Sequence, residues 1–223
     1  MTAEPGKGQT RNPEGGEPTA TAPARLRRLN RWLVEDLRED LADLYEGSRA
    51  AAPGGAYRRP GRRRFLNRLT AGMRRPGFAM VIAETDRLMG CAFGFPVCGD
   101  GAWWLGFAGT LPRRINQLAL SDRAFAFGDI LIRPHPQDRG LARRVQNRLL
   151  TDHQAALGAT LVDRADGPNL AALQSWGWRD MGGIRSPVGA TLLRAMVLPV
   201  GERTEARLED LVAMPGGGGP GGA

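Results

Sequence analysis

The sequence predicts a mixed α/β domain with a mostly antiparallel sheet that is flanked by helices. Three observations predict it. Apolar residues recur every three or four positions early in the chain, as they do on one face of a helix. Residues 78–97 have the pattern of two strands around a polar turn at 84–87. Residues 125–132 form a compact apolar run that suits a central strand, after which helix and strand patterns alternate.

The first half of the domain contains one weak strand and two helices ahead of the hairpin. Leu26 and Leu29 indicate the strand. One amphipathic helix is predicted next, and its apolar positions are Leu33, Leu37, Leu41 and Leu44. A break rich in proline and glycine follows over residues 51–61, and a shorter helix is predicted over residues 65–73, closed by the Pro-Gly pair at 76–77.

The second half is less regular at its start. Residues 98–123 are predicted to be irregular, although residues 115–120 would fit a turn or two of helix. Beyond the central strand, a helix is predicted over 141–156, a strand over 159–163 and a helix over 169–176. Two closing strands are predicted over 176–184 and 190–200.

The two ends of the chain are poor in large apolar side chains. Residues 1–23 and 215–223 cannot bury enough surface to offset the entropy of ordering, so we expect them to be disordered. Residues 24–214 are predicted to form one domain. Neither a run of eighteen apolar residues nor an apolar secretory signal occurs, so we expect a cytoplasmic protein with no membrane partner.

Cysteine and histidine are too scarce to suggest a disulfide framework or a metal site. The cysteines are Cys91 and Cys98, and the histidines are His135 and His153. We expect reduced thiols and no metal. Cys91 lies in an apolar stretch, which favours a small buried core residue over a reactive thiol.

A formal net charge of +8 would ordinarily suggest an acidic or nucleic-acid partner. All but one of the 31 basic residues are arginines, beside 31 glycines and 16 prolines, which is what a GC-rich coding sequence favours. The densest basic cluster, residues 57–64, is predicted to be a solvated connector between helices. Because no groove-entering motif or RNA-binding aromatic signature occurs, nucleic acid ranks last among the expected partners.

Residues 128–144 carry the chemistry, because they combine a strand, a proline-bounded turn and the start of a helix. The first turn of a helix has N–H groups without intrahelical acceptors, and these favour an anion such as a pyrophosphate. Gly140 and Ala142 would let that anion approach the main chain. Further positive charge comes from Arg139, Arg143 and Arg144. Spacing alone also fits an ordinary helix that begins after a glycine-containing turn.

Two short patterns raise this segment above an ordinary helix start. Gln137-x-x-Gly140-x-Ala142 resembles the Gln/Arg-x-x-Gly-x-Gly/Ala signature of the GCN5-related N-acetyltransferases, the GNAT family. Ile130-x-Ile132-x-Pro134 resembles the strand and proline that lead into that signature. The order of the predicted elements is similar to that of the family over most of residues 24–200. The resemblance implies an N-acetyltransferase in which an amine attacks the thioester of bound acetyl-CoA directly.

The resemblance also implies which residues hold acetyl-CoA. The edge of the central strand, at Ile130, Leu131 and Ile132, would hydrogen-bond the pantetheine arm like an added strand. A main-chain N–H near Leu131 would stabilise the developing oxyanion. The residues that would hold the pyrophosphate are Gln137, Asp138, Arg139, Gly140, Leu141, Ala142 and Arg143.

Asp129 is the candidate general base, because an attacking ammonium must first lose a proton. It interrupts the apolar strand where many GNAT sequences carry an acidic residue. The alternative is a strand-edge carboxylate that pairs with an arginine or faces solvent. The family's usual tyrosine acid would fall at Leu173, and Asp166 falls where the family often has an asparagine, so both positions depart from the pattern.

Several aromatic and polar residues have both a structural and a functional interpretation. Trp103, Trp104 and Phe107 are predicted to pack in the core rather than to wall an acceptor site. The remaining residues considered in this way are Tyr45, Trp176 and Trp178, expected to be structural, His135, expected in an exposed turn, and Tyr57, an unassigned phenol.

Two acetyl-CoA hypotheses therefore remain. One is an active N-acetyltransferase, and the other is a weak or inactive acyl-CoA-binding protein of the same fold, which Leu173 favours. The identity of the acceptor amine and the existence of a homodimer stay open.

Overall fold

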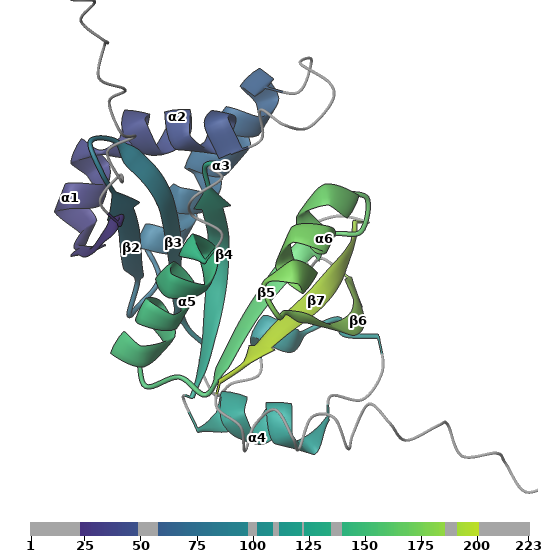
Figure 1. Ribbon diagram of the computed structural model, residues 1–223. Helices are drawn as coiled ribbons and strands as arrows, with labels where there is room; N and C mark the ends of the chain where they lie inside the picture. Colours follow the sequence, from purple (N-terminus) through teal and green to yellow (C-terminus); the bar gives the residue numbers. More distant parts are fainter. Residues whose placement is uncertain are drawn as a thin grey trace, which may run out of the picture.

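The computed structural model describes residues 23–48, 58–97, 102–108, 112–121, 123–134, 140–185 and 191–200. These residues build one sheet with helices on both faces (Figure 1). Its seven strands lie in the order β1-β2-β3-β4-β5-β7-β6. Every neighbouring pair is antiparallel except β4 and β5, which confirms the predicted fold class. The predicted disordered ends, apart from Pro23, lie outside the described residues.

The strands agree closely with the sequence patterns. They are β1 (Arg25–Leu29), β2 (Ala79–Glu84), β3 (Leu88–Pro96), β4 (Ala124–Ile132), β5 (Leu157–Asp163), β6 (Arg179–Arg185) and β7 (Leu192–Pro199). The helices are α1 (Arg31–Asp36), α2 (Arg38–Ser48), α3 (Arg58–Met73), α4 (Arg113–Leu120), α5 (Leu141–Asp152) and α6 (Gly167–Ser175), with a short 3₁₀ helix, η2 (Ala102–Trp104).

The single helix expected around Leu33–Leu44 is wrong, because two helices meet at Leu37. Leu37 caps α1, and its φ of −93° and ψ of 12° leave the helical region. Its N–H still donates to the carbonyl of Leu33 at 3.2 Å. The leucine spacing continues across this break, so the pattern could not reveal it.

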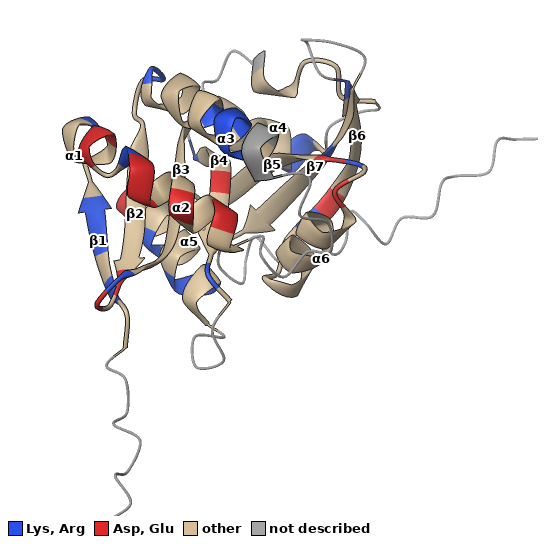
Figure 2. Ribbon diagram, turned by 90° about the horizontal axis from the view of Figure 1, so that it is seen from above, with Lys and Arg blue, Asp and Glu red and all other residues tan. Residues whose placement is uncertain are grey.

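The basic cluster at 57–64 is not a connector in its described part, because α3 begins at Arg58. Pro60 is tolerated there, since the first helical turn needs no donor at that position. Arg62 donates to Glu39 and Asp43 of α2, each at 2.6 Å. Hydrogen bonds to Asp43 and Glu39 raise the pKa of Arg62. Figure 2 shows the basic segments of α3 beside the acidic segments of α2, so the chain uses part of this charge internally.

Two further boundaries differ from expectation. Residues 98–123 are not irregular throughout, because α4 occupies Arg113–Leu120. The side chains of Ile115 and Leu118 on this helix are buried. Two buried positions are too few to define a helical period. The predicted helix 141–156 ends at Asp152, and Gln154 adopts a φ of 49°, which α-helical backbone does not allow.

The sheet has a separate core on each side. On one face, α2 and α3 pack Tyr45 and Phe65 against Phe93 of β3. On the other face, α5 packs against Phe127 of β4. A third cluster contains Trp104 with the partly buried Trp103 and Phe107, which confirms their core-packing interpretation. No helix among the described segments is long and apolar enough to cross a membrane.

His153, at the end of α5, gives the fold a pH dependence. Burial, with a contribution from the charge of Arg28, lowers the pKa of its imidazole, which packs at a tilt against the Phe125 ring. A lowered pKa in the folded state means that the unfolded state takes up the proton first as pH falls. The contribution of His153 to stability is therefore complete above its unfolded pKa and is lost as pH falls through its folded pKa. We expect His153→Gln to flatten the decline in thermal stability between pH 7.5 and 5.5, and an unchanged slope would contradict this.

Candidate functional site

The two parallel strands β4 and β5 pair over three residues and then separate. Ala124–Ala126 lie opposite Leu157–Ala159, and the Thr160 hydroxyl then donates to the Phe127 carbonyl at 3.0 Å. Beyond this point the two strands diverge (Figure 1). On its other side β4 stays paired with β3 as far as Ile132. One main-chain edge of β4, from residue 128 to 132, thus has no strand partner within the described part of the chain.

A β-bulge in β4 coincides with this separation. Asp129 lies opposite Phe93, and Phe127 lies opposite Gly94, so Gly128 has no partner in the β3 register. A bulge bends its strand and increases the local twist, which turns the end of β4 away from β5. Gly128 suits the position because an added Cβ would lie 2.4 Å from the Phe93 ring.

Gly94 provides a test of how tightly this bulge is built. A Cβ at Gly94 would lie 2.0 Å from the Ala126 carbonyl oxygen, which is main chain and cannot rotate away. We expect Gly94→Ala to lower the free energy of unfolding by about 3 kcal/mol, measured by urea denaturation. Gly183→Ala is the matched control, because its Cβ would meet Leu192 at an ordinary 3.4 Å. Equal losses in the two variants would contradict a tight bulge.

The N-terminus of α5 lies on the chain directly after β4 and its following turn. Gly140 is the N-cap, with φ −97° and ψ 0°, and no side chain caps the helix. Among the described residues, a Cβ at Gly140 would meet nothing within 4 Å, so neither their packing nor the backbone conformation requires glycine there. The first-turn N–H groups of a helix have no intrahelical acceptors, and glycine adds no side chain in front of them.

The residues predicted to hold a coenzyme fall into two groups. Leu141 and Ala142 are buried, so that they anchor α5 and present only main chain, whereas Arg143 is exposed. Gln137, Asp138 and Arg139 lie outside the described residues, as does His135. Along the chain the start of α5 follows the β4 edge, and the roles of those four positions stay predictions.

The side chains on the β4 edge face the two cores and leave the main chain for recognition. Leu131 is buried in the cluster formed with α2 and α3. Ile130 and Ile132 pack against the cluster on the α5 side. An extended ligand could therefore hydrogen-bond to this edge as an additional strand would.

Asp129 forms a bidentate ion pair with Arg68, a partner that the sequence did not identify. Arg68 of α3 donates through Nε to Oδ2 at 2.8 Å and through a terminal nitrogen to Oδ1 at 3.1 Å. The Asp129 side chain is 14% exposed. Burial lowers the pKa of Arg68, but the charge and hydrogen bonds of Asp129, with smaller effects from Tyr45, outweigh it and raise the pKa overall. The sequence allowed this carboxylate to pair with an arginine, and the structure shows that pair, while its role as a general base stays a prediction.

Other positions considered at the site are structural. Leu173 is buried at 3% exposure on α6. The Asp166 carboxylate caps α6 by accepting from the Asn169 N–H at 3.3 Å. Trp178 is buried, and its indole N–H donates to Gln146 at 2.8 Å, as expected of a structural residue. Burial, with a contribution from Asp129, raises the pKa of the Cys91 thiol, as expected for a small buried core residue.

Comparison with known proteins gives similarity to solved structures alone. Neither a family model nor a curated protein matches the chain. The PaiA N-acetyltransferase from Thermoplasma acidophilum, in complex with coenzyme A, is 12% identical, covers 79% of this chain and 98% of its own, and gives a TM-score of 0.48. The ribosomal-protein-S18-alanine N-acetyltransferase from Escherichia coli is 15% identical, with coverages of 80% and 97% and a TM-score of 0.43. An aminoglycoside 6'-acetyltransferase type Ii is 14% identical, with coverages of 80% and 99% and a TM-score of 0.49.

Proposed function

We propose that this chain is an N-acetyltransferase of the GNAT type, which transfers the acetyl group of acetyl-CoA to an amine by direct attack. The observation that carries the proposal is the edge of β4 at residues 128–132, which has no strand partner among the described strands and which precedes the N-terminus of α5 along the chain. An extended amide-bearing arm and a pyrophosphate are the two parts of coenzyme A that such features recognise.

Acetyl-CoA would supply the thioester that the amine attacks. In the proposal, the main chain of Ile130, Leu131 and Ile132 binds the pantetheine arm, and an N–H near Leu131 donates to the oxyanion. The amides from Asp138 to Arg143 hold the pyrophosphate. Gly140 supports this role, because no described residue lies within 4 Å of the position that a Cβ would take there.

Asp129 is the proposed base, acting directly or through water. It lies on the segment that would bind the pantetheine arm, two residues before Leu131. The bidentate pair with Arg68 favours the ionised carboxylate, which is the form that accepts a proton, and fixes its orientation.

The second candidate is an acyl-CoA-binding protein of the same fold with weak or no catalysis. Leu173 favours it, because a buried leucine occupies the position where the family's tyrosine acid would stand. A missing acid lowers the rate without abolishing chemistry, since a thiolate is a good leaving group at neutral pH and water can protonate it. We therefore favour the enzyme.

Calorimetric titration of the full chain with acetyl-CoA tests the coenzyme part of the proposal. We expect micromolar affinity for acetyl-CoA, and little or none for acetylated pantetheine, which lacks the pyrophosphate half. Absence of binding at millimolar acetyl-CoA would overturn both candidates. Release of free coenzyme A thiol in the presence of a panel of polyamines, aminoglycosides and peptide N-termini then separates an enzyme from a binding protein.

A further inference from the structure

A cavity of about 440 Å³ lies between α5 and the end of β7. It is lined by Arg143, Gln146, Asn147, Thr151, Trp176, Leu198, Pro199 and Val200. No residue of the free β4 edge is among them. The volume falls within the range of roughly 300–1,000 Å³ that small-molecule sites occupy.

Gln146, which lines this cavity, has a side-chain donor with no acceptor among the described residues. The side chain is fully buried, and its Oε1 accepts from the Trp178 indole at 2.8 Å. Because an indole nitrogen only donates, this bond fixes the orientation of the amide. Its Nε2 then has no acceptor among the described residues. Because an unpaired buried donor is unfavourable, a ligand that brings an acceptor to this wall would be favoured.

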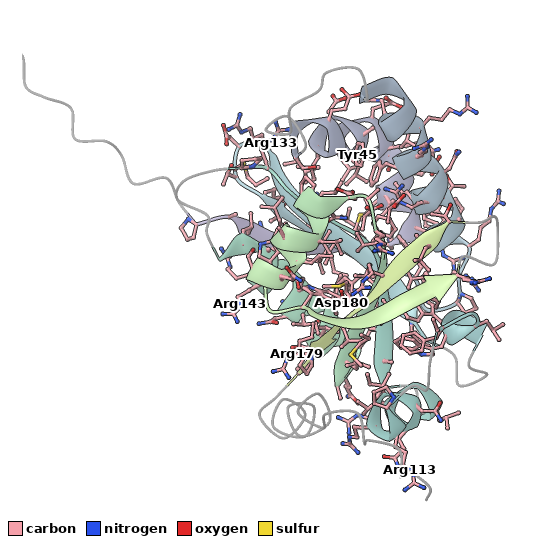
Figure 3. All side chains as sticks on the ribbon, turned by 90° about the vertical axis from the view of Figure 1, so that its right-hand side faces the viewer. Tyr45, Arg113, Arg133, Arg143, Arg179 and Asp180 are labelled. Atoms are coloured by element: carbon pink, nitrogen blue, oxygen red, sulfur yellow. The ribbon has the colours of Figure 1, made fainter. Side chains whose placement is uncertain are left out.

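Among the described residues that line the cavity, Arg143 has the only charged side chain. Arg143 reaches the margin of the molecule (Figure 3), and no described carboxylate pairs with it. Its neighbours on α5 are engaged, since Arg144 donates to the Ala24 carbonyl and Arg148 pairs with Asp152. Asn147 and Thr151 add neutral hydrogen-bonding groups. The polar wall therefore suits an anion that accepts hydrogen bonds.

The opposite wall is apolar. Trp176 is partly buried and offers an indole surface, and Leu198, Pro199 and Val200 continue this surface along the end of β7. Such a wall suits the ring of a ligand, because aromatic rings pack favourably against indole and aliphatic surfaces.

We infer that this cavity is a binding site for a small aromatic carboxylate, whose carboxylate pairs with Arg143 and Gln146 Nε2 and whose ring packs against Trp176 and β7. The site lies beyond the proposed acetyl transfer and uses the side chain of Arg143, whereas the proposed coenzyme site uses the main-chain amide of that residue. Its test is therefore built on Gln146 and Asn147, which have no part in the proposed coenzyme site.

The first experiment compares ligands on the unaltered full chain. Phenylacetate and indole-3-acetate are titrated by calorimetry, with 2-phenylethanol as the ligand that keeps a ring and lacks the charge. We expect the carboxylates to bind at least about tenfold more tightly than the alcohol, as a charged hydrogen bond contributes. Equal affinities for the carboxylates and for the alcohol would overturn the proposal. No carboxylate binding at a ligand concentration of about 10 mM, on the order of the weakest useful dissociation constant, would overturn it as well.

The second experiment uses matched variants. Gln146→Glu keeps an acceptor for Trp178 but replaces the unpaired donor with a negative charge, so we expect carboxylate affinity to fall at least about tenfold. Arg148→Met changes the net charge by the same amount outside the cavity and should leave the carboxylate affinity unchanged. Asn147→Trp should block the cavity by its volume. Equal losses of carboxylate affinity in Gln146→Glu and Arg148→Met would show that the effect comes from net charge alone, and would overturn the proposed site.

A competition experiment separates this site from the coenzyme. Saturating adenosine 3′,5′-bisphosphate should not displace the carboxylate probe, and the affinity of Gln146→Glu for acetyl-CoA should match that of the unaltered chain. Displacement would assign the cavity to the adenosine half of the coenzyme and overturn the inference while supporting coenzyme binding. Probe binding without acetyl-CoA binding would uphold the cavity and reject the proposed function. If a variant fails to fold, the ligand comparison and this competition decide.

Discussion

Gly140→Trp is expected to abolish measurable acetyl-CoA binding while leaving the fold intact. The φ and ψ at Gly140 are accessible to any residue, and no described residue lies within 4 Å of the position of a Cβ there, so the described part of the chain can accept a side chain at Gly140. An indole at that position would fill the space in front of the first-turn N–H groups of α5. Calorimetric titration with acetyl-CoA measures the loss, and thermal unfolding verifies the fold.

Leu120→Trp is the matched control, because it adds the same indole at a position on α4 that is already 59% exposed. It should bind acetyl-CoA as the unaltered chain does. Unchanged affinity in Gly140→Trp would show that any bound coenzyme avoids the start of α5, and would remove the pyrophosphate contact from the proposal.

Most of the strands could be predicted from the sequence because they have a run of apolar residues bounded by turn residues, whereas β1 and β6 have few apolar positions. The helices were harder to delimit. The break at Leu37 interrupts the backbone without interrupting the apolar period, and α4 buries two residues in its short span. Boundaries of this kind depend on local φ and ψ and on tertiary packing, neither of which the apolar pattern records.

The candidate site was predicted in part. The strand-turn-helix segment gave Asp129 and the start of α5, since local sequence determines both. Arg68 was missed because it lies 61 positions away from Asp129 and meets it through the packing of α3 on the sheet. Gly128 and Thr160 were missed because their roles depend on which strands pair and where the pairing ends. A lone acid in an apolar strand could have prompted a search for an arginine on a covering helix.

Asp129→Asn is expected to reduce turnover by about a hundredfold or more without changing the affinity for acetyl-CoA. The amide keeps the size of the side chain and one oxygen that can accept from Arg68, but it cannot take a proton from the amine. Steady-state rates at saturating acetyl-CoA, with any amine that the acceptor panel identifies, measure the loss. An unchanged rate would assign Asp129 to the ion pair alone.

Arg68→Met distinguishes a base from a purely structural carboxylate. Removing the guanidinium leaves Asp129 in place but without the cation that favours its charge. If Asp129 is the base, the acid limb of the pH profile of kcat/KM should move to higher pH, and the same change in an Asp129→Asn background should move nothing. If Asp129 only holds α3 against β4, both single variants should lose stability alike and the pH profile should stay where it is. The direction of the pH profile therefore tests the role of the carboxylate independently of how far the rate falls.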